Sequence, residues 1–377
     1  MLQSISFQNY KAFHGREETV EVRPITLIIG KNSSGKSSIL KLFPLFANML
    51  SGALDYPLVL NNMGISIGTE YSDLFHNGAM TDLKLGLSYD NHIGISASYF
   101  INHGVIAVSD YTVKKGERQF GLTLEQDKSE LHGLIHHGIL SDIDINPADL
   151  RLMVDYLGPF RVIAPHNVVF KGFDNTLRVG YDGSGAYNVL LDSYRSDKVL
   201  FNSVAGWMEQ NLEGQGLEFS NAANNSGTFN LLVRKSDYLQ NLTSVGQGVA
   251  QVLPIITQSY MAKAGSINIM EQPVLHLHPA AHSCVAYRLG LSAKENHCSY
   301  VIESHSENML LGFRHLVVNP DVDFGPEDIV IYFIKHDDEG AYLDKITINK
   351  NGDLSSWPTG VFSEGFELLR SINKMRR

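Results

Sequence analysis

The chain has 377 residues, of which 44% are hydrophobic and 19% charged, a composition typical of a globular protein. No apolar run reaches the roughly 18 residues needed to cross a bilayer, and the first residues lack a signal-peptide pattern, so we expect a cytoplasmic protein with no membrane partner. Only Cys284 and Cys298 are present, which excludes a disulfide framework and a four-cysteine zinc site. The net charge of −10 argues against a chain that coats itself with nucleic acid, although a local basic groove stays open.

Strand-like segments open the chain. Alternating apolar residues predict strands at Leu2–Phe7 and Thr19–Val22, and a third, almost wholly apolar strand at Ile25–Ile29. The sequence GKNSSGKS follows at Gly30–Ser37, and the apolar periodicity of Ile39–Leu50 then predicts a helix. Strand, glycine-rich loop and helix in this order are typical of a phosphate-binding loop, so the sequence predicts a nucleotide site here.

The residues of this loop have separate tasks in such a site. Glycines let the main chain wrap a polyphosphate, the following helix directs N–H groups at it, Lys36 adds positive charge, and Ser37 supplies a hydroxyl to Mg²⁺. The alternative is a glycine-rich turn without a nucleotide, which would leave the flanking strand and helix as coincidence. The residues expected to bind the nucleotide are Gly30, Asn32, Ser33, Ser34, Gly35, Lys36, Ser37 and Ser38.

The middle of the chain predicts two additional subdomains. Period-two alternation over Leu83–Val113, broken by polar turns, predicts meandering antiparallel strands beside the nucleotide core. We expect a helix to begin near Pro147–Leu150, and more helix over Ala186–Leu212, where apolar residues recur at helical spacing. No heptad pattern is sustained, which excludes a long coiled-coil arm.

Strand and helix alternate in the last third of the chain. The segments Ile267–Met270 and Ser299–Ile302 are predicted strands on either side of a helix at Ala280–Ala293, which is the β-α-β order of a parallel sheet. Strand-like runs at Asp328–Lys335 and Tyr342–Ile348 predict a closing hairpin, followed by a final helix near the C-terminus.

Polar residues follow both strands of the predicted β-α-β unit. Glu271 and Gln272 end the first strand, where a P-loop protein needs an acid to hold Mg²⁺, and His305 follows the second, in a position to sense a terminal phosphate. Ser244 and Gly246 stand at a predicted helix start, which is another site for an anion. Taken singly these signals are weak, since a histidine at a strand end is more often a hydrogen-bonded core residue.

The order of these motifs resembles that of ABC-type ATPase heads, and the chain looks most like their RecF/OLD/SMC-like branch. The tracts that carry the resemblance lie towards both ends of the chain: FQNYKAF (7–13), GKNSSGKSS (30–38), SVGQG (244–248), MEQPVLHLHP (270–279) and ESHSE (303–307). Three further tracts, YLGPFR, VGYDG and SSWPTGVFSE, resemble small bacterial AAA-type predicted ATPases with a C-terminal domain of unknown function. Some relatives of that kind serve in anti-phage defence, such as the Septu-type ATPases.

The resemblance implies an α/β fold, a P-loop NTPase head of the ABC type. Such a head has a mixed central sheet, a flanking antiparallel β subdomain and a helical subdomain. On this reading the head covers residues 1–327, with a β and helical insertion at 83–239 between the P-loop and the signature segment. Residues 328–377 would form a C-terminal β-hairpin and helix cap.

The resemblance also implies ATP and Mg²⁺ as cofactors, with Ser37 and Glu271 on the metal. Glu271, Gln272 and His305 would be the catalytic residues. Gln272 departs from the parent pattern, in which a glutamate activates water, because an amide cannot accept a proton as a base. Since glutamine can still orient water, we expect slow hydrolysis rather than none, with His305 or Glu303 sharing the work.

A head-to-tail homodimer with composite sites follows from the same resemblance. One subunit would contribute the phosphate loop and the other Ser244 and Gly246, so that ATP joins the two; dimers could assemble further into a higher homo-oligomer. The turn that carries Asn9 and Lys11 approaches the nucleotide in such heads, so both are expected contacts of lower rank, and a solvated turn is an equally good reading.

Other departures from the pattern limit the prediction. Val274 stands where relatives usually carry an acid, and no glutamine occurs between Ser38 and Arg118 to form a glutamine loop. The segment Tyr71–Gly78 is a candidate replacement, with Asp73 as its weak candidate residue. The acidic cluster of a TOPRIM nuclease domain is absent, so we expect no nuclease activity within this chain.

The expected function is a slow ATPase switch for a separate effector, a nuclease or a toxin, in anti-phage defence or DNA maintenance. Two alternatives stay open. A scaffold could bind ATP without turning it over, which Gln272 favours, or a small-molecule phosphotransferase could use the same loop. The second alternative leaves the Ser244 segment and the Pro273–Pro279 stretch without a task.

Overall fold

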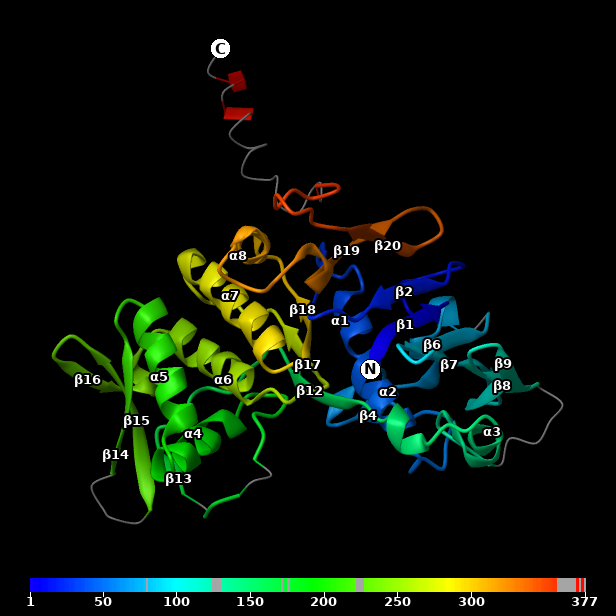
Figure 1. Ribbon diagram of the computed structural model, residues 1–377, viewed down its shortest axis with the longest axis horizontal. Coiled ribbons are helices and arrows are strands. Elements are labelled where there is room, and N and C mark those ends of the chain that lie inside the picture. The colour runs from blue at the N-terminus through cyan, green and yellow to red at the C-terminus, as the bar shows by residue number, and fades with distance from the viewer. Residues whose placement is uncertain are drawn as a thin grey trace.

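The computed structural model describes residues 1–78, 81–123, 130–170, 172–174, 177–221, 227–357, 371–372 and 374–375. Within these residues a six-stranded sheet lies between two lobes, with the strand order β12-β17-β18-β3-β19-β20 (Figure 1). The first five strands are parallel and β20 is antiparallel, which confirms the predicted mixed sheet. The strands are β3 (Ile25–Gly30), β12 (Met153–Leu157), β17 (Ser266–Glu271), β18 (Ser299–Glu303), β19 (Ile329–His336) and β20 (Ala341–Ile346).

The central strands are apolar because both faces of the sheet are covered. Successive side chains of a strand point to opposite faces, and β3 illustrates the result: Ile25 and Leu27 belong to one hydrophobic core and Ile28 to the other. One core joins the sheet to the N-terminal lobe, and the other joins it to the helical lobe. The sheet is therefore the shared wall of two cores, which fixes the ends of its strands in space.

The N-terminal lobe contains an antiparallel sheet with the order β2-β1-β6-β7-β8-β9, on the right of Figure 1. Its pairing confirms the strands predicted at the start of the chain and the meander predicted over residues 83–113. The strands are β1 (Leu2–Gln8), β2 (Glu18–Glu21), β6 (Leu83–Tyr89), β7 (Ile93–Asn102), β8 (Val105–Lys115) and β9 (Arg118–Leu122). Smaller elements of this lobe are β4 (Asn61–Asn62), β5 (Ile65–Ser66), η1 (Tyr71–Leu74), η2 (His76–Gly78), β10 (Leu131–His132), β11 (Ile135–His136), α3 (His137–Asp142) and η3 (Pro147–Leu150).

The helical lobe lies on the left of Figure 1 and combines helices with a second antiparallel sheet. Its elements are β13 (Val168–Val169), α4 (Gly185–Arg195), α5 (Val199–Asn211), β14 (Gly216–Asn221), β15 (Thr228–Lys235), β16 (Tyr238–Asn241), η4 (Leu242–Ser244) and α6 (Gln247–Met261). The helix expected over 186–212 is two helices, because Lys198 adopts a left-handed conformation with φ of 61° that interrupts the hydrogen-bond pattern.

Four more helices pack on the central sheet within the described residues. They are α1 (Lys36–Leu40), α2 (Leu42–Met49), α7 (Pro279–Glu295) and α8 (Glu307–Val318). The predicted hairpin is present as β19 and β20, and β19 pairs in parallel with β3, so the hairpin extends the main sheet. The final helix, expected after Trp357, lies mostly outside the described residues.

One expectation for the middle of the chain is wrong. The helix predicted to begin near Pro147 is only the 3-10 turn η3, and the chain then enters β12, which pairs with β17. The pairing with a buried neighbouring strand outweighs the local helical signal. No helix among the described residues is both long and apolar enough to pass through a membrane.

Candidate nucleotide site

The phosphate loop joins the carboxyl end of β3 to the start of α1. Gly35 precedes the helix with φ of 105°, and a Cβ atom there would lie 3.0 Å from the Phe13 ring, so both backbone angle and space require glycine. The Lys36 Nζ donates hydrogen bonds to the carbonyl oxygens of Gly30 (3.1 Å) and Lys31 (2.7 Å). Burial lowers the pKa of Lys36, and the charge of Glu303 opposes this shift. The main chain of the loop thus curls around the ammonium group of Lys36.

Two carboxylates lie beside this loop at the same level of adjacent strands. Glu271 on β17 and Glu303 on β18 are paired in the parallel register, and both are buried. The Ser37 hydroxyl donates a hydrogen bond to Glu303 Oε2 at 2.7 Å, and Glu303 Oε1 lies 3.9 Å from Lys36 Nζ. Carboxylate and hydroxyl oxygens are the ligands that Mg²⁺ prefers, and they meet here next to the loop.

Glu271 has its own hydroxyl partner. The Tyr156 hydroxyl, at the end of β12, donates a hydrogen bond to Glu271 Oε1. Burial raises the pKa of Glu271, and the charge of Glu303 adds to this shift, whereas the hydrogen bonds from Tyr156 and Ser37 oppose it. Burial beside this carboxylate also raises the pKa of Tyr156 far above its ordinary value.

Gln272 is held by its main chain. Its φ is 44°, its N–H donates to the Glu303 carbonyl at 2.8 Å, and its own carbonyl accepts from Arg161 Nη2 at 3.2 Å. The same Arg161 nitrogen donates to the Glu271 carbonyl at 2.8 Å. The two hydrogen bonds from Arg161 stabilise the turn that carries Glu271 and Gln272. Burial lowers the pKa of Arg161 to about 10, and the charge of Glu271 opposes this shift.

His305 follows Glu303 at the same edge of the sheet and is half-buried. Burial and the positive charge of Lys36 lower the pKa of His305. Its buried Nε2 finds no hydrogen-bond partner among the described residues. Lys36, Ser37, Glu271, Gln272 and His305 therefore gather at one end of the parallel sheet, because β3, β17 and β18 all end there.

The turn from Asn9 to Phe13 lies against the phosphate loop. The Tyr10 hydroxyl donates to the Ser38 carbonyl at 3.2 Å, and the Phe13 ring packs on Gly35. The side chains of Asn9 and Lys11 have partners within the fold: Asn9 Nδ2 donates to the Asp82 carbonyl at 2.9 Å, and Lys11 Nζ to the Ile67 carbonyl. Tyr10 and Phe13 therefore make the contacts of this turn with the loop, while the side chains of Asn9 and Lys11 contact other parts of the fold.

Asp73, the candidate for the missing glutamine loop, is engaged in the same lobe. Its Oδ2 accepts hydrogen bonds from the Thr69 N–H at 2.7 Å and the Glu70 N–H at 3.0 Å, where it caps the 3-10 turn η1. The hydrogen bond from the Thr69 hydroxyl lowers the pKa of Asp73 most, and the two main-chain hydrogen bonds lower it further.

Ser244 and Gly246 are exposed on the helical lobe, in η4 and just before α6. Among the described residues, no hydrogen bond or ion pair links them to the phosphate loop of the same chain. They flank a groove of about 350 Å³ that also includes Phe160 and Ile163, which are 84% and 87% exposed. The sequence-predicted site residues are therefore divided between two separate surfaces.

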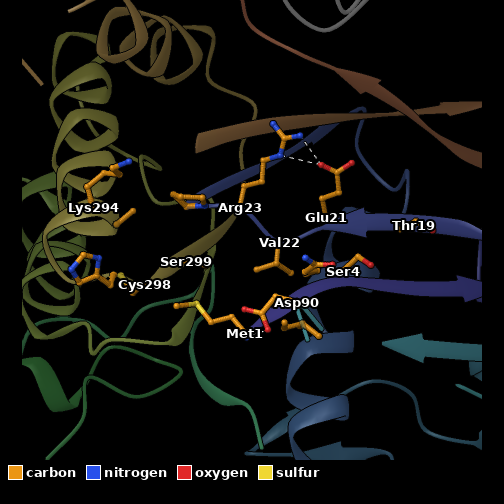
Figure 2. Close-up of a pocket in the computed structure, with 15 residues that line it drawn as sticks. Met1, Ser4, Thr19, Glu21, Val22, Arg23, Asp90, Lys294, Cys298 and Ser299 are labelled. Carbon is orange, nitrogen blue, oxygen red and sulfur yellow. Dashed lines mark hydrogen bonds and ion pairs between the residues drawn. The ribbon is translucent and has the colours of Figure 1, made fainter. Parts of the chain in front are cut away.

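A larger cavity lies at the opposite end of the strands. Figure 2 shows this space of about 610 Å³, beside the amino ends of β3 and β18. Charged groups that line it are paired with each other or with neighbours: Arg23 with Glu21 at 2.8 Å, and Lys294 with Asp328 at 3.0 Å. Ligands of parallel sheets bind at the carboxyl ends of the strands, so this cavity is a poor candidate for the nucleotide.

Two known protein families match parts of this chain, and one of the matched segments includes the phosphate loop. A family described as an AAA domain, putative AbiEii toxin, Type IV TA system, matches residues 25–311, which is more than half of the chain. The chain belongs to this AAA family. A second family, described as a protein of unknown function (DUF3696), matches residues 325–372. No curated protein matches this AAA-family chain.

Two solved structures are similar to this AAA-family chain. An SmcHead bound to the C-winged helix domain of ScpA has a TM-score of 0.52 at 12% identity, covering 93% of this chain and 98% of its own. The SMC head domain from Thermotoga maritima has a TM-score of 0.47 at 11% identity, covering 91% of this chain and 98% of its own. The similarity to the first of these structures shows that this chain has an SMC-head-like fold.

Tyr156 and Arg161 are site residues that the sequence reasoning did not assign. Both belong to the tract YLGPFR, which resembles small predicted ATPases but contains no pattern that by itself indicates a site residue. Their signal was the run from Met153 to Leu157, because a strand parallel to β17 ends at the same edge as Glu271. The expectation of a helix near Pro147 concealed that strand.

Proposed function

We propose that the chain is an ABC-type ATPase that binds ATP with Mg²⁺ and hydrolyses it slowly. The observation that carries the proposal is the meeting of Lys36, Ser37 and two carboxylates at the carboxyl edge of the parallel sheet. A P-loop lysine, a hydroxyl and an acid are the groups that ATP and its metal require. Membership of the AAA family supports the same activity.

The residues of the loop fit a polyphosphate. Gly35 lets the main chain turn at φ of 105°. In the described part of the chain, the partners of Lys36 Nζ are two loop carbonyl oxygens and Glu303, which the phosphates could replace. The buried Ser34 hydroxyl has no partner among the described residues. Ser37 and Glu271 are the proposed metal ligands, with phosphate oxygens completing the shell, and bound Mg²⁺ would neutralise the charge that develops on the phosphates.

Slow turnover follows from the residue at position 272. Gln272 would orient the attacking water without accepting its proton, and His305 would contact the terminal phosphate. The lowered pKa of His305 keeps its imidazole neutral at physiological pH, so that one nitrogen can accept a hydrogen bond.

A head-to-tail homodimer would complete the site. Ser244 and Gly246 are exposed, and within the described residues no hydrogen bond or ion pair joins them to the phosphate loop of their own chain. Phe160 and Ile163 expose large apolar side chains beside them. Exposed apolar groups next to a helix start are typical of a surface that another protein covers. We propose that this surface meets the phosphate loop of a second copy.

ATP-driven dimerisation would then act as a switch for a separate effector, a nuclease or a toxin, in anti-phage defence or DNA maintenance. The description of the matched family as a putative toxin of a toxin–antitoxin system supports a defence role. The SMC head similar to this chain is bound to ScpA, which supports a protein partner. Both points rest on likeness of family and fold.

Steady-state phosphate release tests the proposal. The wild type should release phosphate from ATP slowly, and Lys36→Ala should abolish the release because it removes the phosphate contact. ATP binding without any release would favour the alternative of a scaffold, to which Gln272 is equally suited. Release that requires an added acceptor would favour a phosphotransferase.

A further inference from the structure

We infer that Glu303 is the acid that positions Ser37 for Mg²⁺, whereas the motif order predicts Glu271 as the acid that binds the metal itself. The inference rests on the proposed function, and it deepens the metal site. It makes Glu303 a positioning residue that acts through the Ser37 hydroxyl, while Glu271 is held by Tyr156 one strand further away.

The direction of the Ser37 hydrogen bond carries the first step. The Ser37 hydroxyl lies near both carboxylates, since it also lowers the pKa of Glu271, but its single proton is donated to Glu303 Oε2 at 2.7 Å. The lone pairs of the hydroxyl oxygen are then left for another partner. A hydroxyl can ligate a divalent cation only through those lone pairs. A carboxylate that accepts the hydrogen bond of the Ser37 hydroxyl therefore orients its oxygen for a metal ion.

The strand order gives the second step. β18 pairs directly with β3, which leads into the phosphate loop, whereas β17 is separated from β3 by β18. Glu303 thus stands on the strand next to the loop. It is 3% exposed and contacts both functional side chains of the loop, Lys36 and Ser37.

The rival explanation is that Glu303 merely neutralises Lys36. The geometry favours Ser37, because Lys36 Nζ lies 3.9 Å from Glu303 but 2.7 Å from the Lys31 carbonyl and 3.1 Å from the Gly30 carbonyl. A neutralising role would change ATP binding with or without metal. A positioning role for the metal ligand changes only the part of ATP affinity that depends on Mg²⁺.

The test measures ATP affinity by titration calorimetry in excess EDTA and in excess MgCl₂. We expect Glu303→Gln to reduce the affinity gained from Mg²⁺ by about 10- to 100-fold, the size typical of residues that orient metal ligands, and to leave affinity in EDTA unchanged. Ser37→Ala should lose a similar gain, and the double variant should be no worse than Ser37→Ala alone. Glu307→Gln, an exposed neighbour with the same charge change, is the control.

The outcomes separate this inference from the proposed function. A wild type that binds no ATP would overturn both. A wild type with a clear Mg²⁺ gain that Glu303→Gln retains, or effects of Ser37→Ala and Glu303→Gln that simply add, would overturn the inference alone. Thermal unfolding checks folding. If Glu303→Gln is unfolded, Glu303→Asp keeps the charge but shortens its reach, and retention of the full Mg²⁺ gain in that variant would equally overturn the inference.

Discussion

The main chain of Gln272 is fixed by a φ of 44°, by a hydrogen bond to the Glu303 carbonyl and by one from Arg161, none of which uses the Gln272 side chain. A glutamate should therefore occupy the same place without moving the turn. We predict that Gln272→Glu accelerates phosphate release by at least about tenfold, because a positioned general base contributes roughly 10²- to 10⁴-fold.

The control for this substitution is Gln119→Glu, which adds the same charge on an exposed part of β9. The control should leave the rate unchanged. An unaltered rate for Gln272→Glu would mean that water is activated by another residue.

Glu271 links this site to folding stability. Burial raises the pKa of Glu271, so between its unfolded and folded pKa values the folded chain binds a proton that the unfolded chain does not. The free energy of unfolding contributed by this group therefore falls as the pH rises through that window. We predict that Glu271→Gln raises the melting temperature without nucleotide at pH values above it.

The gain should shrink as the pH is lowered through the window, because Glu271 then carries its proton in the folded wild type. Melting curves of both proteins over a series of pH values would check this. A melting temperature that Glu271→Gln lowers at every pH would show that the charged carboxylate stabilises the fold.

At the scale of elements, helices α7 and α8 pack closely through Gly312. A Cβ atom at this position would lie 2.8 Å from Ser283 Cα and 2.9 Å from Ala286 Cβ. We predict that Gly312→Ala lowers the free energy of unfolding by about 1–3 kcal/mol, as overpacking typically does. Chemical denaturation measures the change in both variants. Gly206→Ala is the control, because a Cβ atom there meets open space on α5 and the substitution should raise the free energy of unfolding by about 0.5–1 kcal/mol. Equal stability changes in both variants would contradict the close packing.

The elements that sequence could predict are those whose signal is local. The apolar strand before Gly30, the loop that Gly35 and Lys36 complete, and the alternation of 83–113 depend on neighbours in sequence, and the structure has them as expected. The strand β12 and the break at Lys198 depend on tertiary packing, and were missed. The contact of Ser37 with Glu303 joins residues 266 positions apart, which no spacing rule reveals.

At the scale of the molecule, the proposed nucleotide-binding residues lie on two surfaces. The phosphate loop belongs to the central sheet and the N-terminal lobe, and Ser244 and Gly246 belong to the helical lobe (Figure 1). Their separation within one chain is the reason to propose a second copy. ATP would then be required to bring the two surfaces together.

The most direct test of this account is the mass in solution by light scattering, with and without ATP and Mg²⁺. The wild type should gain mass towards a dimer with ATP, and Ser244→Arg, which places a long charged side chain at the proposed interface, should not. Ser356→Arg, the same change at another exposed serine, should behave as the wild type. A mass that responds neither to ATP nor to Ser244→Arg would contradict the ATP-driven composite site.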